Sequence, residues 1–386
     1  MAAEEKEKKD FVRTVEGRTT FLVPQSSLTE RVPPKTPAFF NPAARLNRDL
    51  SVLAYRAFAP SLTRKTFADS FTGIGARALR VAVEVPEIEK VYGNDINPVA
   101  IEAARKAAKI NSVDSKCHFS IDEVCKFLLH GDSEGERFGI VDLDPFGTPA
   151  KHIDCVLRAV LDGGLVSITA TDTAVLCGVY PEVCLRRYYG RPLNNSYGNE
   201  TAIRLLLSLI ALTASRLELS IRPLFVHAAM HYLRIYASVS VSSSEANDVY
   251  ASIGYVMHCL QCGHRFKTEE YNNAKKCELC GSVMRTGGQL WTGPFHDREF
   301  VKKMMLEQSP DRQSKKVLDA AAEEESGIPY YFRADEISAK LRTNPHSVQN
   351  IIERLQSAGF VASKTVLNPS AFKTDARIDQ ILEALK

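Results

Sequence analysis

The stretch FGIVDLDPFG, residues 138–147, predicts a buried strand that ends in a ligand-binding turn. Pro145 cannot donate a hydrogen bond to a neighbouring strand, so the strand should end there, and Gly147 allows a tight turn to follow. In open α/β sheets, ligands bind at the carboxyl ends of the strands. We therefore expect Asp144, Pro145 and Phe146 at the reaction site, where the carboxylate would accept a hydrogen bond from an exocyclic amino group and the ring would stack on a base. The alternative is an ordinary strand end with an incidental phenylalanine.

A glycine-rich turn lies upstream of this strand. A strand over residues 66–71 leads into TGIGAR, residues 72–77, and a helix follows. Gly73 and Gly75 let the backbone turn sharply and approach a ligand closely. The turn alone also fits the relaxed fingerprint of dinucleotide-binding proteins, so an NAD-dependent enzyme is one alternative.

Two further acids are predicted at strand ends. The strand over residues 90–94 ends at Asp95, about twenty residues beyond the glycine turn, where a carboxylate can hold the two hydroxyls of a ribose. A helix over residues 98–111 then completes a βαβ unit. A third strand, near residues 117–119, ends at Asp122, which is placed to meet an adenine amino group.

Three features favour S-adenosylmethionine over NAD. Asp69 lies just before the glycine turn, where an acid can face the amino-acid end of S-adenosylmethionine but would repel a pyrophosphate. The turn opens as Asp-x-Phe-x-Gly, with Phe71, rather than with glycine directly after the strand. The acid–Pro–Phe turn comes at about the fourth strand, where methyltransferases of amino groups keep it. The residues expected to bind the cofactor on these grounds are Asp69, Phe71, Gly73, Gly75, Asp95, Ile96 and Asp122.

The remaining pattern predicts an α/β fold. Three further strands are predicted over residues 164–169, 222–226 and 232–241, with an apolar helix over residues 205–217. They would complete the seven-stranded sheet of a Rossmann-like, class I methyltransferase domain, which we place at residues 11–245 together with an N-terminal extension. The charged residues 1–10 are expected to be disordered. Cys177 and Cys184 lie outside the acid–Pro turn, so we expect small core residues rather than nucleophiles for carbon methylation.

Two adjacent aromatic residues precede a basic helix near the N-terminus. Asn41 suits the cap of that helix and Pro42 its first turn, and Arg48 follows on the helix itself. Phe39 and Phe40 could line a cofactor or base pocket. Alternatively, they pack on the helix as a hydrophobic staple.

Two CxxCG knuckles, residues 259–263 and 277–281, predict a zinc ribbon. Four thiolates give zinc a closed tetrahedral site, which is structural rather than catalytic. Unpaired or redox-active cysteines are the alternative. We place this zinc-ribbon-containing region at residues 246–306. Its expected ligands are Cys259, Cys262, Cys277 and Cys280.

The last segment, residues 307–386, has the pattern of a smaller α+β domain with a winged-helix-like part. Residues 307–326 are polar and predict a surface helix or linker. A helix over residues 334–341 precedes a second helix, for which Thr343 is the expected cap and Gly359 the expected end. One face of this second helix could dock on a nucleic-acid backbone, or it could be a solvated face of a packing module. The residues of that face are His346, Gln349, Asn350 and Arg354.

Composition sets wider limits. With 386 residues, 45% apolar and 25% charged, the chain should hold two or three globular domains, and its net charge of +3 permits a nucleic-acid partner without requiring one. The N-terminus is too charged for a signal peptide, and the longest apolar stretch is too short to span a bilayer. Nine cysteines, four of them in CxxC pairs, suit a metal site in a reducing compartment better than a disulfide framework. We expect a cytoplasmic or, in a eukaryote, a nuclear monomer that needs no membrane and no obligate protein partner.

These motifs together resemble those of the tRNA (guanine-26-N2) dimethyltransferase family. The resemblance covers the chain from about residue 11, and DLDPFG and the NRD of residues 47–49 are its most specific parts. It implies methyl transfer from S-adenosylmethionine to the exocyclic N2 of guanosine 26 in tRNA, giving N2-methylguanosine and N2,N2-dimethylguanosine. It also implies that residues 307–386 bind tRNA, that Asp144 is the catalytic acid, and that Phe146 with Phe39 or Phe40 sandwiches the guanine. The implied contacts with S-adenosylmethionine are Arg48, Asp69, Asp95 and Asp122.

Two other functions fit the same sequence. An amino-methyltransferase that acts on another RNA or on DNA would share every catalytic feature. A non-catalytic regulator would bind nucleic acid through the ribbon and the winged helix, and its Rossmann-like domain would only sense the cofactor. Against the regulator stand four acids at strand ends, because nothing structural requires them. They are Asp69, Asp95, Asp122 and Asp144.

Overall fold

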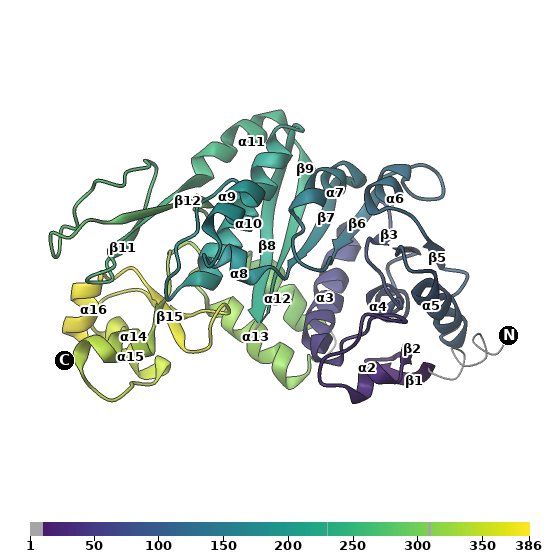
Figure 1. Cartoon of the computed structure of the whole chain (residues 1–386), viewed down its shortest axis with the longest axis horizontal. Helices are drawn as coiled ribbons and strands as arrows, with labels where there is room; N and C mark the ends of the chain where they lie inside the picture. The colour runs from purple at the N-terminus through teal and green to yellow at the C-terminus, as the bar shows by residue number, and fades with distance from the viewer. Residues whose placement is uncertain (1–10, 230, 308–309) are drawn as a thin grey trace.

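The computed structural model describes residues 11–229, 231–307 and 310–386; the disorder expected for residues 1–10 lies outside them. A seven-stranded sheet with the order β5-β4-β3-β6-β7-β9-β8 runs through the centre (Figure 1). Its strands are β3 (Thr66–Asp69), β4 (Lys90–Asn94), β5 (Cys117–Ser120), β6 (Phe138–Leu143), β7 (Val160–Ala170), β8 (Leu219–Ala229) and β9 (Tyr232–Val241). The predicted Rossmann-like α/β sheet is therefore confirmed.

The strand order explains where a ligand can bind. Strands β3 to β7 pair in parallel, whereas β9 runs antiparallel to both β7 and β8. The chain leaves β3 toward β4 and β5, then returns to place β6 on the other side of β3. At such a reversal the loops that follow neighbouring strands diverge, so a crevice opens at the carboxyl ends of the strands.

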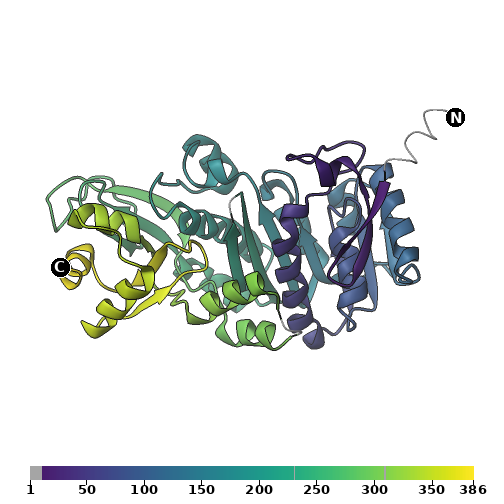
Figure 2. The ribbon, with the colours of Figure 1, turned by 90° about the horizontal axis from the view of Figure 1, so that it is seen from below.

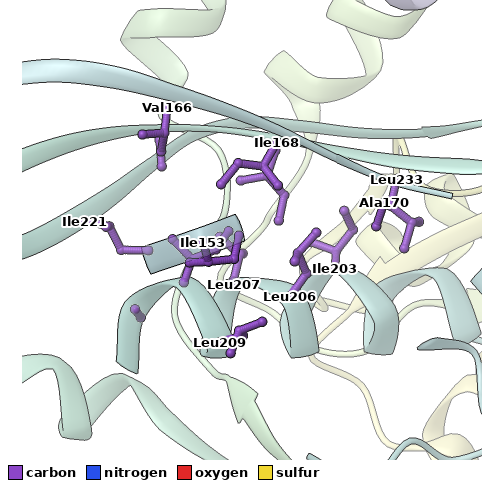
Figure 3. Packing of buried hydrophobic residues seen from close by; sticks show 14 of the residues in the cluster. Ile153, Val166, Ile168, Ala170, Ile203, Leu206, Leu207, Leu209, Ile221 and Leu233 are labelled. Atoms are coloured by element: carbon purple, nitrogen blue, oxygen red, sulfur yellow. The ribbon is translucent and has the colours of Figure 1, made fainter. Parts of the chain in front are cut away.

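Helices cover both faces of the sheet because side chains alternate along each strand. Phe67 and Ile140 point into one core, and Ala68 and Val141 point into the other. The first core is closed by α3 (Arg45–Phe58), α4 (Ala76–Glu84), α12 (Arg298–Leu306) and α13 (Arg312–Glu323). The second is closed by α6 (Val124–His130), α7 (Ile153–Ala159) and the apolar α10 (Gly198–Ser215). Figure 3 shows Val166 and Ile168 of the sheet above Ile203, Leu206 and Leu207 of α10.

Helix α13 lies in the segment expected to be a surface helix or linker. Its Leu318 and Ala321 are fully buried in the first core, together with Met304 of α12. Figure 2 shows α12 and α13 beside α3, on the same side of the sheet. The segment is polar as a whole because only one stripe of α13 faces the core.

The N-terminal extension is a hairpin that packs beside α4 and α5 (Pro98–Ile110). Its strands are β1 (Phe11–Glu16) and β2 (Thr19–Pro24), and the short helices α2 (Ser26–Thr29) and η1 (Pro42–Ala44) follow. Asn41 caps η1 as predicted, because its side-chain oxygen accepts a hydrogen bond of 3.0 Å from the backbone N–H of Ala43. The short helix η2 (Ala59–Ser61) extends α3.

Five further short helices lie between or after the elements of the main sheet, and a small sheet leads on to the C-terminal part. The helices α8 (Thr173–Leu176) and α9 (Pro181–Tyr188) follow β7, η3 (Ala150–His152) precedes α7, and α11 (Ser243–Asp248) with η4 (Val249–Ser252) follows β9. The small sheet has the order β11-β10-β12. Its strands are β10 (Ile253–His258), β11 (Arg265–Thr268) and β12 (Arg285–Trp291).

The C-terminal part has a core of its own, built on a sheet with the order β13-β15-β14. Its elements are β13 (Phe332–Arg333), α14 (Ala334–Leu341), α15 (Val348–Ser357), β14 (Ala362–Lys364), β15 (Ala371–Thr374) and α16 (Ile378–Ala384). The predicted start of α15 was wrong. Ser347, not Thr343, caps the helix by accepting a hydrogen bond of 3.2 Å from the N–H of Asn350. Gly359 follows the end of α15 with a φ of 88°, as a helix-terminating glycine requires.

Two cysteines depart from the expected pattern. Cys125 of α6 and Cys155 of α7 form a disulfide across 30 residues of sequence. Cys184 is a buried free cysteine and Cys177 a half-buried one, as expected for core residues. No described helix is both long enough and apolar enough to cross a bilayer.

Candidate active site

A cavity of about 390 Å³ opens at the carboxyl ends of β3, β4 and β6, where the strand order reverses. It brings together residues that are far apart in the sequence. The predicted site residues that line it are Phe39, Phe40, Arg48, Asp69, Phe71, Gly73, Asp95, Asp144, Pro145 and Phe146. The glycine turn and the acid–Pro–Phe turn, which are far apart in the sequence, therefore meet at one cavity.

Three predicted cofactor residues lie outside this lining. Gly75 supports the turn instead, because it precedes α4 with a φ of 81° that side chains rarely adopt. Ile96 is 76% exposed. Asp122 bonds the ammonium of Lys126 at 2.6 Å, and its backbone N–H donates to the side chain of Asn94.

Asp69 is buried at the end of β3, and only the hydroxyl of Thr72 donates to it among the described residues, at 3.0 Å. Burial, followed by the charge of nearby Asp142, raises the pKa of Asp69 to about 7. A carboxyl group in this state takes up a cation readily, because a positive neighbour lets it ionise.

Asp95 fastens the glycine turn to the start of α5. One carboxylate oxygen accepts a hydrogen bond of 2.9 Å from the N–H of Gly73, and the other accepts one of 2.9 Å from the N–H of Asn97. The side chain still lines the cavity. Asp95 therefore fixes the cavity wall as well as facing into it.

Arg48 is engaged by a partner that the sequence did not suggest. Its guanidinium donates to both carboxylate oxygens of Glu16, each at 2.7 Å, and to the backbone oxygen of Asn41 at 3.1 Å. It also lies 5.0 Å above the ring of Phe40. Arg48 thus ties the N-terminal hairpin to α3 at the edge of the cavity.

Asp144 lies between two guanidiniums. Arg77 of α4 donates to its carboxylate, and a nitrogen of Arg234 in β9 lies 3.8 Å from the same oxygen. Although burial acts to raise it, the charges of Arg77 and then Arg234 hold the pKa of Asp144 below its ordinary value. The side chain is still 30% exposed to the cavity. Asp144 is therefore a reachable carboxylate that stays ionised.

A second carboxylate, that of Asp142, binds the same two arginines. Asp142 is fully buried and pairs with Arg234, and it lies 3.3 Å from the Nε of Arg77. The hydroxyl of Tyr55 also donates to Asp142, and it accepts from Arg234 at 2.9 Å. Because each buried charge has opposite partners, the arginines can hold Asp144 in one place.

The aromatic residues divide into a buried and an accessible pair. Phe40 is only 4% exposed and packs against Phe21, so it is a core residue that touches the cavity. Phe146 is 62% exposed, and it meets Phe39 in a T-shaped contact with the ring centres 4.8 Å apart. A base between two stacked rings needs roughly 7 Å, or two contact distances. A sandwich of Phe39 and Phe146 around a base therefore requires one ring to move.

Three residues of this arrangement, Arg77, Arg234 and Asp142, were not among the predicted site residues. One signal was available, since Asp142 in the buried strand and Asp144 just after it are two residues apart, a spacing that places both side chains on one side of an extended chain. Two acids on one side of a buried strand require a cation opposite them. The sequence alone does not say which arginine supplies it.

Comparison with known proteins shows the family to which the chain belongs. The model of the N2,N2-dimethylguanosine tRNA methyltransferase family matches residues 17–386. The chain belongs to this family. It is thus a tRNA methyltransferase of this family, and the regulator and NAD alternatives are not favoured.

Relatives of this methyltransferase match it over 80–99% of their length. The tRNA (guanine(26)-N(2))-dimethyltransferase of Methanothermobacter thermautotrophicus is 34% identical, over 96% of this chain and 97% of the relative. The tRNA (guanine(26)-N(2)/guanine(27)-N(2))-dimethyltransferase of Aquifex aeolicus is also 34% identical, over 80% of each chain. The solved structure of Trm1 from Pyrococcus horikoshii with S-adenosyl-L-methionine has a TM-score of 0.82 and 26% identity, over 97% of this chain and 99% of that one.

The methyltransferase also carries the predicted cysteine cluster. Within the cluster the sulfurs of Cys259 and Cys280 are 3.4 Å apart, and those of Cys262 and Cys277 are 3.5 Å apart. A tetrahedral zinc with Zn–S bonds of about 2.3 Å places its sulfurs about 3.8 Å apart, so the four side chains fit that ion. The N–H of Gly263 donates to the carbonyl of Cys259, which closes the first knuckle.

Proposed function

We propose that this protein transfers methyl groups to the exocyclic N2 of guanosine 26 in tRNA, giving N2-methylguanosine and then N2,N2-dimethylguanosine. The observation that carries the proposal is the ionised carboxylate of Asp144. It stands on the acid–Pro–Phe turn in the wall of the cavity that Asp69 and Asp95 also line. Acceptor and cofactor can therefore meet in one cavity.

The cofactor half of the cavity would be built from β3 and β4. The buried carboxyl of Asp69 suits the ammonium of the amino-acid end, because a cation there would let the group ionise. Asp95 and the turn at Gly73 suit the ribose, with Phe71 beside them. Asp122 follows β5 outside this lining and would have to approach the adenine from there. S-adenosylmethionine supplies an electrophilic methyl group on a sulfonium.

The acceptor half would be built from the turn after β6. The lone pair of guanine N2 is delocalised into the ring, so this amine is a weak nucleophile. Asp144 would accept hydrogen bonds from the N2 hydrogens, orient the nitrogen toward the methyl group and stabilise the positive charge that develops on it. Because two arginines lower its pKa, Asp144 suits a charge-stabilising acceptor better than a group that keeps the proton. The proton would pass on to water.

The base has to leave its stack to reach this turn. The exposed ring of Phe146 would then stack on it, which offsets roughly 1–3 kcal/mol of the unstacking cost. Phe39 would swing from its edge contact with Phe146 to admit the base. We propose the cytoplasm or, in a eukaryote, the nucleus as the site of action, since tRNA is modified there.

The test is to incubate the purified protein with labelled S-adenosylmethionine and an unmodified tRNA transcript, and to identify the modified nucleoside by mass spectrometry. We expect N2-methylated guanosine, and no label in a matched transcript with adenosine at position 26. Label on another nucleoside, or preference for ribosomal RNA or DNA, would overturn the assigned substrate while the role of Asp144 stayed open to test.

A further inference from the structure

A second hollow, larger than the active-site cavity, opens on the other side of the catalytic turn. It has a volume of about 890 Å³, and Phe146 lines both spaces. Its walls come from the turn itself, from η3 and α7, from α9 and from the end of α10. We call this hollow the basic groove, after the residues Lys151, Arg186, Arg187 and Arg216 that line it.

The charge of the groove is strongly one-sided. Its described lining carries these four cations and a single carboxylate, Asp154, although the whole chain has a net charge of only +3. Arg216 pairs with Asp154, and Arg187 pairs with Asp172 at 3.1 Å. Among the described residues, no acid lies within ion-pair distance of Lys151 or Arg186, and both side chains are exposed.

The groove is also fixed relative to the reaction site. The buried Tyr188 of α9 shares a hydrogen bond of 2.7 Å with the hydroxyl of Thr148, two residues beyond Phe146. The same tyrosine donates to Asp172 at 2.7 Å. Because of these bonds, the arginines of α9 stand at a set distance from the catalytic turn.

An exposed aromatic ring stands in the same wall. Tyr189 follows α9 with a φ of 54°, a left-handed conformation that is unusual for a bulky residue, and its side chain is 67% exposed. A large ring that is left in solvent at a strained position offers a stacking surface.

We infer that the basic groove holds the tRNA backbone on either side of the target guanosine, with Lys151 and Arg186 on phosphates and Tyr189 stacked on a neighbouring base. The inference rests on the proposed function for the nature of the polymer. Phosphate is the ligand that unpaired lysine and arginine recognise, and aromatic rings between such cations are the pattern of a single-stranded nucleic-acid site. Once the target base enters the cavity beside Phe146, its flanking phosphates must lie near that ring, where the groove begins.

The test compares two double variants that change the net charge equally. Lys151→Glu/Arg186→Glu alters the groove, whereas Lys106→Glu/Lys109→Glu alters exposed positions of α5 that lie outside the groove lining. Binding of an unmodified tRNA transcript is measured over a range of salt concentrations, and folding is checked by thermal melting.

We expect at least tenfold weaker binding for the groove variant and a change of less than twofold for the control. The slope of log affinity against log salt concentration should also become shallower by about 1–2, and only for the groove variant. Each lost phosphate contact removes roughly 0.7–0.9 from this slope.

Kinetics separate the groove from the chemistry. For the groove variant we expect the KM for tRNA to rise with the lost affinity, while kcat and the Kd for S-adenosylmethionine stay near wild type. Tyr189→Ala should weaken tRNA binding severalfold, and Tyr189→Phe should not, because stacking needs the ring but not the hydroxyl.

The outcomes are distinguishable. Wild-type protein that binds tRNA but methylates no guanosine would overturn the proposed function, and the binding comparison would still decide the groove. Unchanged tRNA affinity in the groove variant, or an equal loss in the control variant, would overturn the groove inference even if methylation at position 26 were established.

Discussion

Asp144 differs from an ordinary surface acid in what surrounds it. Two guanidiniums, one from α4 and one from β9, meet at its carboxylate, and the fully buried Asp142 balances them from the other side. Such an arrangement holds the carboxylate in one position and keeps it charged, which is what a hydrogen-bond acceptor for a weakly nucleophilic amine requires.

The first prediction concerns this carboxylate. Asp144→Ala should lower the single-turnover rate of methyl transfer by about 10²–10⁴, because N2 loses its orienting acceptor and its charge partner. The Kd for S-adenosylmethionine, measured by calorimetry, should change little. Asp144→Asn keeps the shape and one acceptor oxygen, so it should recover only part of the rate. Full activity in Asp144→Ala would remove this residue from the mechanism.

The second prediction concerns the pH dependence of stability. The pKa of Asp69 is raised from an ordinary 3.8 to about 7 in the folded protein. Between pH 3.8 and pH 7 the folded protein holds a proton that the unfolded chain has released. The protonated carboxyl group therefore stabilises the fold at low pH, and this contribution is lost as the pH rises through 7. The Tm of Asp69→Asn minus the Tm of the wild type, both measured by calorimetry, should therefore be a few degrees larger at pH 8 than at pH 5. A difference that is independent of pH would contradict the raised pKa.

At the scale of elements, the glycine turn between β3 and α4 depends on its backbone conformation. Gly75 has a φ of 81°, and a Cβ there would meet Ala104 at 3.0 Å and Leu79 at 3.1 Å. Asp95 then anchors the neighbouring Gly73. The conformation of the turn therefore depends on the positive φ of Gly75 and on the bond from Gly73 to Asp95.

The third prediction separates strain from crowding at this turn. Gly75→Ala and Gly135→Ala share a left-handed φ, but a Cβ at Gly135 would meet nothing within 4 Å. Gly135→Ala should cost about 1–2 kcal/mol in unfolding free energy from the backbone alone. Gly75→Ala should cost more and should also weaken S-adenosylmethionine binding. Urea titration and calorimetry measure both, and equal costs for the two variants would show that crowding is absent.

At the scale of the whole molecule, a buried ion cluster joins the C-terminal part to α10. The ammonium of Lys373 in β15 lies 3.1 Å from Glu200 of α10 and 3.2 Å from Glu324, and all three side chains are fully buried. Arg204 pairs with Glu200, and His296 lies 3.3 Å from Glu324. Lys373 thus ties β15 of the C-terminal part to α10 and to Glu324 through buried ion pairs.

The fourth prediction concerns that cluster. Lys373→Met leaves two buried carboxylates short of a partner and should cost about 3–5 kcal/mol in unfolding free energy. Lys364→Met on the neighbouring strand removes an exposed pair with Glu323 and should cost about 1 kcal/mol or less. Urea unfolding of both variants measures the difference. Similar costs would show that the buried lysine is dispensable.

The fifth prediction concerns the cysteine cluster. Elemental analysis should find about one zinc per chain, and Cys259→Ser/Cys277→Ser should lose it together with thermal stability. Cys117→Ser, outside the cluster, should keep the metal. A folded, fully stable protein without zinc would show that the four cysteines do not hold a structural ion.

The sequence by itself determined the sheet, the two turns and the cysteine cluster. These features rest on chemistry that acts locally. Proline has no N–H, glycine reaches a positive φ, strands alternate their side chains, and a CxxCG knuckle presents two sulfurs at once. A short window of residues therefore carried each of these signals.

Only the tertiary structure decided which charges meet and which aromatic ring is exposed. Arg234 pairs with Asp142 across 92 residues, and Lys373 pairs with Glu200 across 173 residues. Phe40 enters the core, while its neighbour Phe39 contacts Phe146 of the acid–Pro–Phe turn. The energy of an ion pair depends on distance and burial, and both are set by how the whole chain packs rather than by the residues next to each group.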